Sequence, residues 1–515
     1  MKDVPEPTEL ETPAAAAATL DFSRLADLEA KIEMPTIPRS LIDRYRGLSR
    51  PGSLPALAGK GAVDLAAAFR RRFLQRMSMG WTLVEQQRID EIGTAAYLDE
   101  QLDPESIDDQ GLEDALHEAL PTLSMTPGEI FLQYREDVAV PLLELLVATS
   151  LRSIYSPRQL VERMAVFWTD HFNIFLYALP AAFLKPADDR DVVRRHALGT
   201  FPDLLRASAH SPAMLDYLTN NSNVRDHPNE NYSRELMELH TLGVGGGYTE
   251  QDVKEVARCF TGWTYWGYDA GPSFGSFLFS PRLHDFEAKT VLGQTIPAGR
   301  GIEDGEAVID ILAGHPSTAR FIATKMLRYM WGYEPPPAAI EDVAQTYLDT
   351  GGDIRSMLRS IFVDSGFFKL PAAKIKRPYH LIVSSMRALF AEIRNPLLIV
   401  RAAENAGHVP YGWPPPNGYP DDAGYWSGFL LPRWNFASAA LTSEDAGVIL
   451  DLPFLDPSLP AEQLVSILDA LLLAGTMDPG TRDAVRVFLD AAPPSPLRLR
   501  EAIGLVLASP EFQQY

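Results

Sequence analysis

The stretch QLVERMAVFWTDHFNIFL, residues 159–176, decides the fold class of this chain. Drawn as a helix, it is apolar on nearly every face, and a helix of that kind is normally buried. Pro157 lies near its start, where proline is tolerated. We therefore expect a buried helix whose apolar surface is interrupted by Asp170 and His171.

Helical spacing of apolar residues continues on both sides of this stretch. The segments with this pattern are 86–102, 111–120, 127–155, 189–218, 229–242, 249–261, 303–331, 338–350, 353–363, 378–391, 397–406 and most of 432–515. Residues 262–300 differ, because aromatic residues alternate there with Gly, Thr and Ser, as in strands. The sequence thus predicts a mainly α, multi-helix globular protein with a small aromatic-rich β hairpin or meander near 262–300.

Changes in composition predict four parts of the chain. Residues 1–20 are rich in Pro, Glu and Ala and indicate a disordered tail, and the prolines of 21–80 indicate an irregular N-terminal arm. We expect a main helical domain over 81–430, which includes a polar core segment at 229–300. The remaining part, 431–515, is expected to be a helical segment packed on that domain.

Composition excludes several kinds of protein. The net charge of −22 argues against binding to nucleic acid, which needs clustered Lys and Arg. The one cysteine, Cys259, permits no intramolecular disulfide. The N-terminus has no signal-peptide pattern, and no apolar stretch reaches about 18 residues without a charge, so we expect no transmembrane segment and, from this N-terminus, a cytoplasmic protein.

The pair Asp170–His171 is the first candidate site. A polar pair inside an apolar helix needs partners, since each unsatisfied group costs about 1–3 kcal/mol. His171 is therefore either a core histidine bonded to a carboxylate or carbonyl, or a metal ligand or general base held on a rigid helix. On this residue alone, the core histidine is the favoured interpretation.

The second candidate is NENYSRELMELHTLG, residues 229–243. At 100° per residue, Glu230, Asn231, Arg234, Glu235 and Glu238 fall within one arc of about 140°. They form either a solvated salt-bridge face, with Glu230 and Arg234 paired, or a site. In a site, Glu235 and Glu238 would bind a divalent cation or act as acid and base, and Arg234 would bind an anionic group.

The third candidate is PRLHDFEAKTVLG, residues 281–293. His284 and Asp285 lie in a predicted loop, with Glu287 and Lys289 close in sequence. Such residues can build a metal or acid–base site. The alternative is a loop in which Asp285 only stabilises a turn.

Together these segments resemble a bacterial family catalogued as domain of unknown function 1800. The resemblance covers roughly 80–515 and is carried by FWTDHFNIF (167–175), the block 229–263, His284–Asp285 with Lys289, HPSTARFIATKML (315–327), KIKRP (374–378) and the terminal LASPEF. It implies no assured activity. It does imply proteins that are often exported, and that are often encoded beside a sulfatase- or phosphatase-like family, domain of unknown function 1501. This chain departs from the pattern by having no visible export signal.

These observations lead to two hypotheses. The first is a metal-assisted enzyme for a polar or envelope-associated substrate, with catalytic Glu235, Glu238, Arg234 and Asp285 and metal ligands His171, Glu235, Glu238 and His284. Such ligands suit a divalent ion such as Zn, Mn or Fe. The alternative is a non-catalytic helical scaffold that works with a partner of the 1501 family, in which the same side chains form a buried network.

Overall fold

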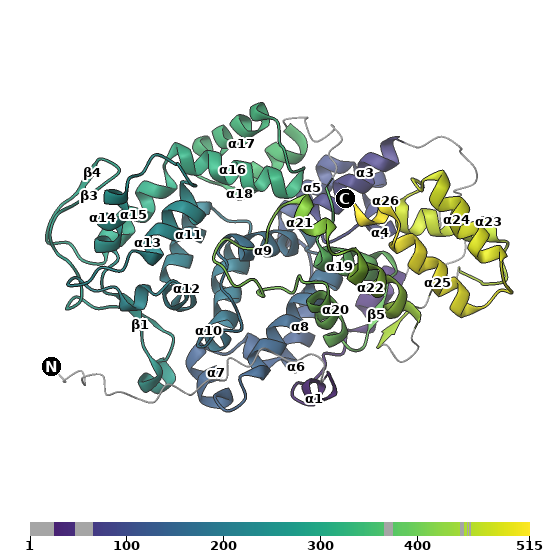
Figure 1. Cartoon of the computed structure of the whole chain (residues 1–515), viewed down its shortest axis with the longest axis horizontal. Coiled ribbons are helices and arrows are strands. Elements are labelled where there is room, and N and C mark those ends of the chain that lie inside the picture. The colour runs from purple at the N-terminus through teal and green to yellow at the C-terminus, as the bar shows by residue number, and fades with distance from the viewer. Residues whose placement is uncertain (1–24, 47–64, 365–373, 443–446, 451, 453–454) are drawn as a thin grey trace.

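The computed structural model describes residues 25–46, 65–364, 374–442, 447–450, 452 and 455–515 (Figure 1). The predicted tail at 1–20 lies outside these residues. Helices account for 63% of the chain and short two-stranded sheets for 5%, which confirms the mainly α class. The molecule is elongated, with the hairpins of residues 263–296 near one end and the C-terminal helices at the other (Figure 1).

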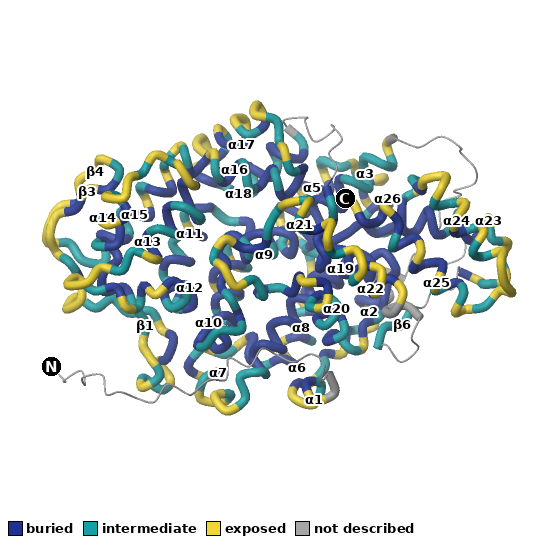
Figure 2. The backbone as a smooth tube through the Cα atoms, in the orientation of Figure 1, coloured by how far each residue is buried: buried dark blue, intermediate teal, exposed yellow. Residues whose placement is uncertain are grey.

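Two consecutive helices form the centre of the core. They are α8 (Ala139–Tyr155) and α9 (Gln159–His171), and nearly all of their residues are buried (Figure 2). The helices and helical segment that pack on one or both of them include α10 (Ala181–Asp188), the π-helical segment η4 (Asp189–Arg194), α19 (Pro378–Ala388) and α20 (Leu397–Asn405). The predicted buried helix at 159–176 thus exists, but it ends at His171.

Contacts with a distant part of the chain accompany the early end of α9. The N–H of Phe172 still bonds the Trp168 carbonyl, whereas the N–H of Leu176 donates to the Tyr411 carbonyl at 3.0 Å. Asn173 Nδ2 donates to the carbonyls of Trp413 and Pro415. The chain therefore leaves the helix to bind the loop that follows α20.

The remaining helices surround this centre. Those of the N-terminal part are α1 (Leu25–Glu29), α2 (Arg39–Arg46), α3 (Leu65–Met77), α4 (Leu83–Ile92), α5 (Thr94–Leu102), α6 (Gln110–Ala119) and α7 (Pro127–Tyr134). Those from the middle of the chain are α11 (Phe201–His210), α12 (Pro212–Tyr217), α13 (Asn231–Glu235), α14 (Glu250–Cys259), α15 (Glu303–Ala313), α16 (Pro316–Met330), α17 (Pro337–Thr350) and α18 (Ile354–Arg359).

The C-terminal helices complete the fold. They are α21 (Ala423–Ser427), α22 (Leu430–Thr442), α23 (Ala461–Leu468), α24 (Pro479–Asp490), α25 (Pro496–Leu507) and α26 (Pro510–Gln513), and α22 packs on α25. Short helical turns lie at η2 (Pro104–Ser106), η3 (Pro121–Leu123), η5 (Asn220–Ser222), η7 (Tyr268–Ser273), η8 (Ser360–Asp364) and η10 (Asp469–Leu473). No helix within the described ranges has the length and apolar character that crossing a membrane requires.

The predicted strands form small antiparallel hairpins. β1 (Trp263–Tyr265) pairs with β2 (Phe277–Phe279), and β3 (Lys289–Val291) pairs with β4 (Gln294–Ile296). A further pair, β5 (Glu392–Ile393) with β6 (Val448–Ile449), was not expected. The aromatic hairpin expected near 262–300 is therefore confirmed.

The segment predicted as one helix at 229–242 is divided into two. After α13 the chain continues as the π-helical segment η6 (Leu236–Thr241), in which the N–H of Leu242 reaches the Met237 carbonyl. Thr241 Oγ1 also donates to the Leu236 carbonyl at 2.7 Å. A π turn places more residues in each turn than an α-helix, so side chains after Leu236 leave the directions of an ideal wheel.

Candidate functional site

His171 lies at the buried end of α9, where it is 1% exposed. Its Nε2 is 3.1 Å from the carbonyl oxygen of His240 in η6. Its Nδ1 is 3.0 Å from Nζ of Lys325 in α16. His171 therefore donates from Nε2 and accepts at Nδ1, which brings together three segments far apart in sequence.

Both histidines are held in the neutral form. Burial is the largest cause that lowers the pKa of His171 well below its usual value, and it lowers the pKa of His240 to about 3. Their ring centres are 6.0 Å apart, and His240 Nε2 is buried without a partner among the described residues. Burial also lowers the pKa of Lys325, to about 8.

A second set of buried charges borders this group. Arg377 binds the carboxylate of Asp170 and lies 3.4 Å from that of Asp421. Lys374 Nζ is 2.7 Å from the Asp421 carboxylate, and burial lowers its pKa to about 7. The three basic side chains of the segment KIKRP, Lys374, Lys376 and Arg377, are therefore buried.

An enclosed cavity adjoins Asp170. Its volume of about 20 Å³ has room for about one water molecule. Its polar lining includes Thr169, Glu162, Arg194 and Tyr411. No substrate of ordinary size fits in it.

The acidic face of α13 and η6 is a partly exposed ion-pair cluster. Arg234 binds Glu250 through both Nη atoms, at 2.9 and 2.7 Å, and lies 3.2 Å from Glu230 and 3.6 Å from Glu238. The expected pair Glu230–Arg234 is thus present. Glu250, on α14, was not among the predicted site residues, because nothing in the sequence indicates that this helix faces α13.

Glu235 differs from the other carboxylates of this face. It has no hydrogen bond or ion pair with any residue that the structure describes. Burial, and then the charge of Glu238, raise its pKa. Its charge also helps to raise the pKa of Tyr217 to about 12, after the larger effect of burial, so the two side chains are neighbours. Tyr217 in turn donates to the carbonyl of Pro414.

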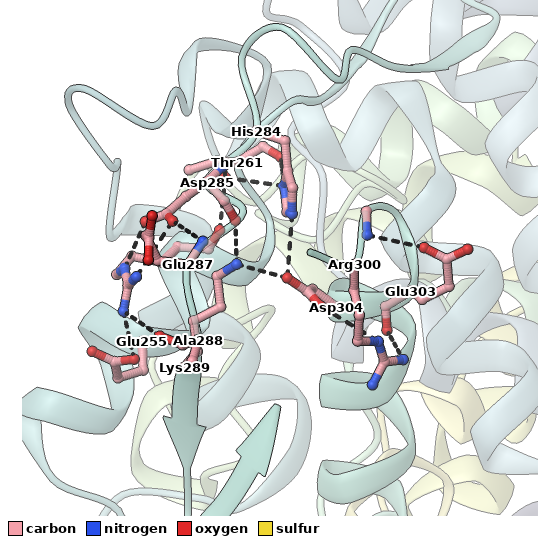
Figure 3. A network of polar contacts seen from close by, with 12 residues as sticks. Glu255, Thr261, His284, Asp285, Glu287, Ala288, Lys289, Arg300, Glu303 and Asp304 are labelled. Carbon is pink, nitrogen blue, oxygen red and sulfur yellow. Dashed lines mark hydrogen bonds and ion pairs between the residues drawn. The ribbon is translucent and has the colours of Figure 1, made fainter. Parts of the chain in front are cut away.

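His284 belongs to a separate buried network (Figure 3). Its Nδ1 lies 2.7 Å from the carbonyl oxygen of Thr261, and its Nε2 lies 3.2 Å from Oδ2 of Asp304 in α15. Lys289 Nζ is 2.6 Å from the same Asp304 oxygen. Both ring nitrogens of His284 are therefore engaged with oxygen atoms, and the network ties the hairpin loop to α15.

Asp285 points away from His284, toward α14 (Figure 3). Arg258 holds its carboxylate with distances of 2.7 and 3.3 Å and also binds Glu255 at 2.8 Å. Burial acts to raise the pKa of Asp285, but the hydrogen bonds from Arg258 and the Glu287 N–H, with the neighbouring cations, lower it overall. The ionised Asp285 carboxylate, which accepts two hydrogen bonds from Arg258, fastens the loop to α14.

The predicted site residues thus lie in three groups. His171 is with His240 and Lys325, Arg234 is with Glu238 and its other acidic neighbours, and His284 and Asp285 are in the hairpin network. No hydrogen bond or ion pair between described residues joins one group to another. In the part of the chain that the structure describes, no three or more His, Cys, Asp or Glu side chains form a group that could hold a metal ion. The geometry gives no support to the predicted metal centre, which stays a prediction.

Sequence reasoning missed Lys325 and Arg377. Lys325 follows apolar residues in the block 315–327, and the apolar spacing of that block indicates only a helix. The signal that could have been used was a pair of lone charges, Lys325 and Asp170, each set among apolar residues of a predicted buried helix.

Fold and geometry together define a mainly helical protein with buried histidine, lysine and carboxylate groups at its centre. The chain belongs to the family described as "Protein of unknown function (DUF1800)", whose sequence pattern matches residues 72–514. This match confirms the resemblance noted from the sequence. Comparisons with curated proteins and with solved structures found no match.

Proposed function

We propose that this protein is an enzyme that acts on a polar or envelope-associated substrate, with His171 and Lys325 as its proton-transfer groups. One observation carries the proposal: Nζ of the partly buried Lys325 donates to Nδ1 of the buried His171 at 3.0 Å. A lysine with a pKa of about 8 exists in both protonation states near neutral pH. It can therefore give up a proton and take it back during a reaction.

The surroundings of this pair support a role in chemistry. Rings of Phe167, Trp168, Phe172, Phe201 and Phe321 lie around His171. Aromatic surroundings disfavour the charged form of the Lys325 amine. The neutral imidazole of His171 supplies no negative charge that would stabilise that form. Groups whose pKa is moved toward neutrality in this way are more frequent at functional sites than elsewhere.

The experiment is a substrate screen with matched variants. Purified protein is incubated with a mixture of polar metabolites and with a digest of bacterial envelope polymers, and mass spectrometry follows each component. We expect at least one component to be consumed in excess over the protein, and consumption to fall at least about 100-fold in Lys325→Gln. Lys254→Gln, an exposed lysine of α14, is the control. Equal turnover by the wild type and Lys325→Gln would refute the role of Lys325.

The metal-assisted form of this proposal has its own test. Elemental analysis of the purified protein measures Zn, Mn and Fe per chain. A stoichiometric metal that is lost in a folded Glu235→Ala/His284→Ala variant would support the predicted ligands. If an active protein contains no metal, the reaction depends on proton transfer by the protein's own side chains.

A second candidate function is that of a scaffold, and one surface feature favours it. Leu430, Leu431 and Trp434 on α22 are 44%, 65% and 48% exposed. Adjacent exposed apolar side chains of this size are typical of protein-binding surfaces. The partner that the resemblance implies is a protein of the domain of unknown function 1501 family.

Co-purification tests the scaffold directly. A partner of that family is expected to be retained by the wild type and lost from Leu431→Lys/Trp434→Glu. Val487→Lys, another exposed apolar position, serves as the control. Retention by the double variant would exclude this surface as the interface.

A further inference from the structure

A charged groove lies beside the first turn of α9, and none of the predicted site residues contributes to it. Its volume is about 350 Å³, which falls within the usual range of small-molecule sites, about 300–1,000 Å³. It is formed by α6, α8, α9, α10 and η4. Its charged lining consists of Asp109, Glu113, Arg152, Arg158, Glu162, Asp189, Arg190, Arg194 and Arg195.

Three of the five arginines are already neutralised by acidic partners. Arg152 binds Glu113 with two hydrogen bonds, at 2.8 and 2.6 Å. Arg194 binds Glu162 at 2.9 and 3.2 Å and Asp189 at 2.7 Å. These bidentate pairs hold the walls of the groove in place.

The third neutralised arginine lies at the edge. Arg190 pairs with the neighbouring Asp191 and donates to two backbone carbonyls. All three nitrogen atoms of its guanidinium group thus donate hydrogen bonds. It contributes shape to the groove and no free charge.

Two arginines remain without an ion pair, although the charge of Arg158 acts on the nearby Asp109 and Glu105 carboxyl groups. Among the residues described by the structure, Arg158 has only a backbone contact for its guanidinium, from Nε to the Ile107 carbonyl at 2.9 Å, and Arg195 forms no hydrogen bond or ion pair from its side chain. Arg158 is partly buried and Arg195 is exposed. This concentration of free positive charge stands out on a chain with a net charge of −22.

A buried carboxyl group faces the same groove. Asp109 is 4% exposed, and its Oδ2 accepts from Ser156 Oγ at 2.5 Å. Its Oδ1 has no partner within the described part of the chain. An unbonded carboxyl oxygen buried at the wall of a groove needs a partner, and a bound molecule can supply one.

We propose that this groove binds a small oxyanion with two negative charges, held by Arg158 and Arg195 and hydrogen-bonded by Asp109 in its protonated form. Two guanidinium groups without an ion pair match two negative charges. Guanidinium groups suit carboxylates and tetrahedral oxyanions alike, so a dicarboxylate and a sulfate or phosphate group share the required chemistry. This binding is independent of the proton transfer proposed for Lys325.

The protonation of Asp109 makes binding sensitive to pH. Burial is the largest cause that raises its pKa to about 7; Glu162 and Glu113 raise it further, whereas Ser156 and Arg158 lower it. Arg152 and Arg194, on the neighbouring α8 and η4, are paired with those glutamates. Below this pKa the carboxyl can donate to an anion, and above it the carboxylate repels one. Affinity is therefore expected to fall as the pH rises through about 7.

Isothermal titration of the full chain with sulfate and, separately, with succinate tests the proposal. We expect one binding site per chain for at least one probe, and a loss of about tenfold or more in Arg158→Gln/Arg195→Gln. Arg225→Gln/Arg282→Gln removes the same charge from distant surface positions and is the control. Binding of sulfate alone indicates a tetrahedral oxyanion, and binding of succinate alone indicates a dicarboxylate.

Two results would overturn the proposal. One is no saturable binding of either probe up to about 10 mM. The other is an equal loss in the groove variant and the control variant, since that would reflect net charge alone. Sulfate keeps its charge over about pH 6 to 8, so its affinity should fall across this range in the wild type and stay level in Asp109→Asn. An unchanged pH dependence in Asp109→Asn would remove Asp109 from the site, and circular dichroism confirms that each variant is folded.

Discussion

At the scale of single residues, the partly buried lysine beside His171 links stability to pH. The folded protein lowers the pKa of Lys325 from 10.5 to about 8, so between these values the unfolded chain binds more protons than the folded one. The free energy of unfolding should therefore rise with pH in this window, by about 3 kcal/mol in total. Urea unfolding at several pH values measures the rise, which should be absent from Lys325→Met. An identical pH dependence in that variant would mean that the amine titrates normally.

Asp304 is the residue on which the hairpin network depends. Its carboxylate is the shared partner of His284 and Lys289, and all three side chains are at most 1% exposed. Asp304→Ala leaves the Lys289 ammonium buried without its anion, which should cost about 3–5 kcal/mol. Chemical denaturation measures this loss.

The matched control for Asp304 is on the same helix. Asp310 pairs with Arg206 at the surface, with its side chain 69% exposed. Its replacement by Ala should cost less than about 1 kcal/mol. Similar losses for Asp304→Ala and Asp310→Ala would contradict the structural importance given to the buried network.

At the scale of elements, the start of α14 provides a clean test of local stabilisation. Thr249 Oγ1 accepts from the N–H of Asp252, and the Asp252 carboxylate accepts from the N–H of Thr249, as in a capping box. Thr249→Ala should lower the free energy of unfolding by about 1 kcal/mol. Thr346→Ala, inside α17, should leave stability unchanged or raise it slightly, because Ala favours a helix interior. A larger loss at position 346 than at position 249 would contradict the capping argument.

Elements whose signals are local could be predicted, and those set by distant contacts could not. The cap at Thr249 and the hairpin that begins at Trp263 follow from neighbouring residues, and both are present. The end of α9 at His171 depends on the Tyr411 carbonyl, which is 240 residues further along the chain. The π-helical turn of η6, whose His240 ring lies 6.0 Å from that of His171, was likewise not predicted from a wheel at 100° per residue.

The same distinction between local signals and distant contacts explains which features of the candidate sites could be predicted. The sequence identified His171, Glu235 and His284 as unusual, because each is a polar residue in a distinctive setting. The packing between helices decides which of these residues come together, and the periodicity of apolar residues does not predict that packing. The pairing of His171 with Lys325, across 154 residues, is the clearest case.

At the scale of the whole molecule, the fold class followed from the amphipathic pattern of most segments and is confirmed. The predicted boundaries at 81, 430 and 431 stay predictions. The backbone of 374–376 bonds that of 513–515, so that the C-terminal end of the chain lies beside the buried basic segment (Figure 1). This contact gives the elongated molecule a connection between its middle and its C-terminal helices that the sequence alone did not indicate.

The proton-transfer role proposed for this protein depends on the pKa of the Lys325 amine. Trace acetylation of the folded protein with acetic anhydride over about pH 6 to 11, followed by mass spectrometry of the peptide that contains Lys325, gives the pKa of this amine. We predict half-titration at about pH 8, well below the value of 10.5 that is usual for a lysine amine. If Lys325 titrates near 10.5, its amine is an ordinary cation, and the proton-transfer role proposed for it is wrong.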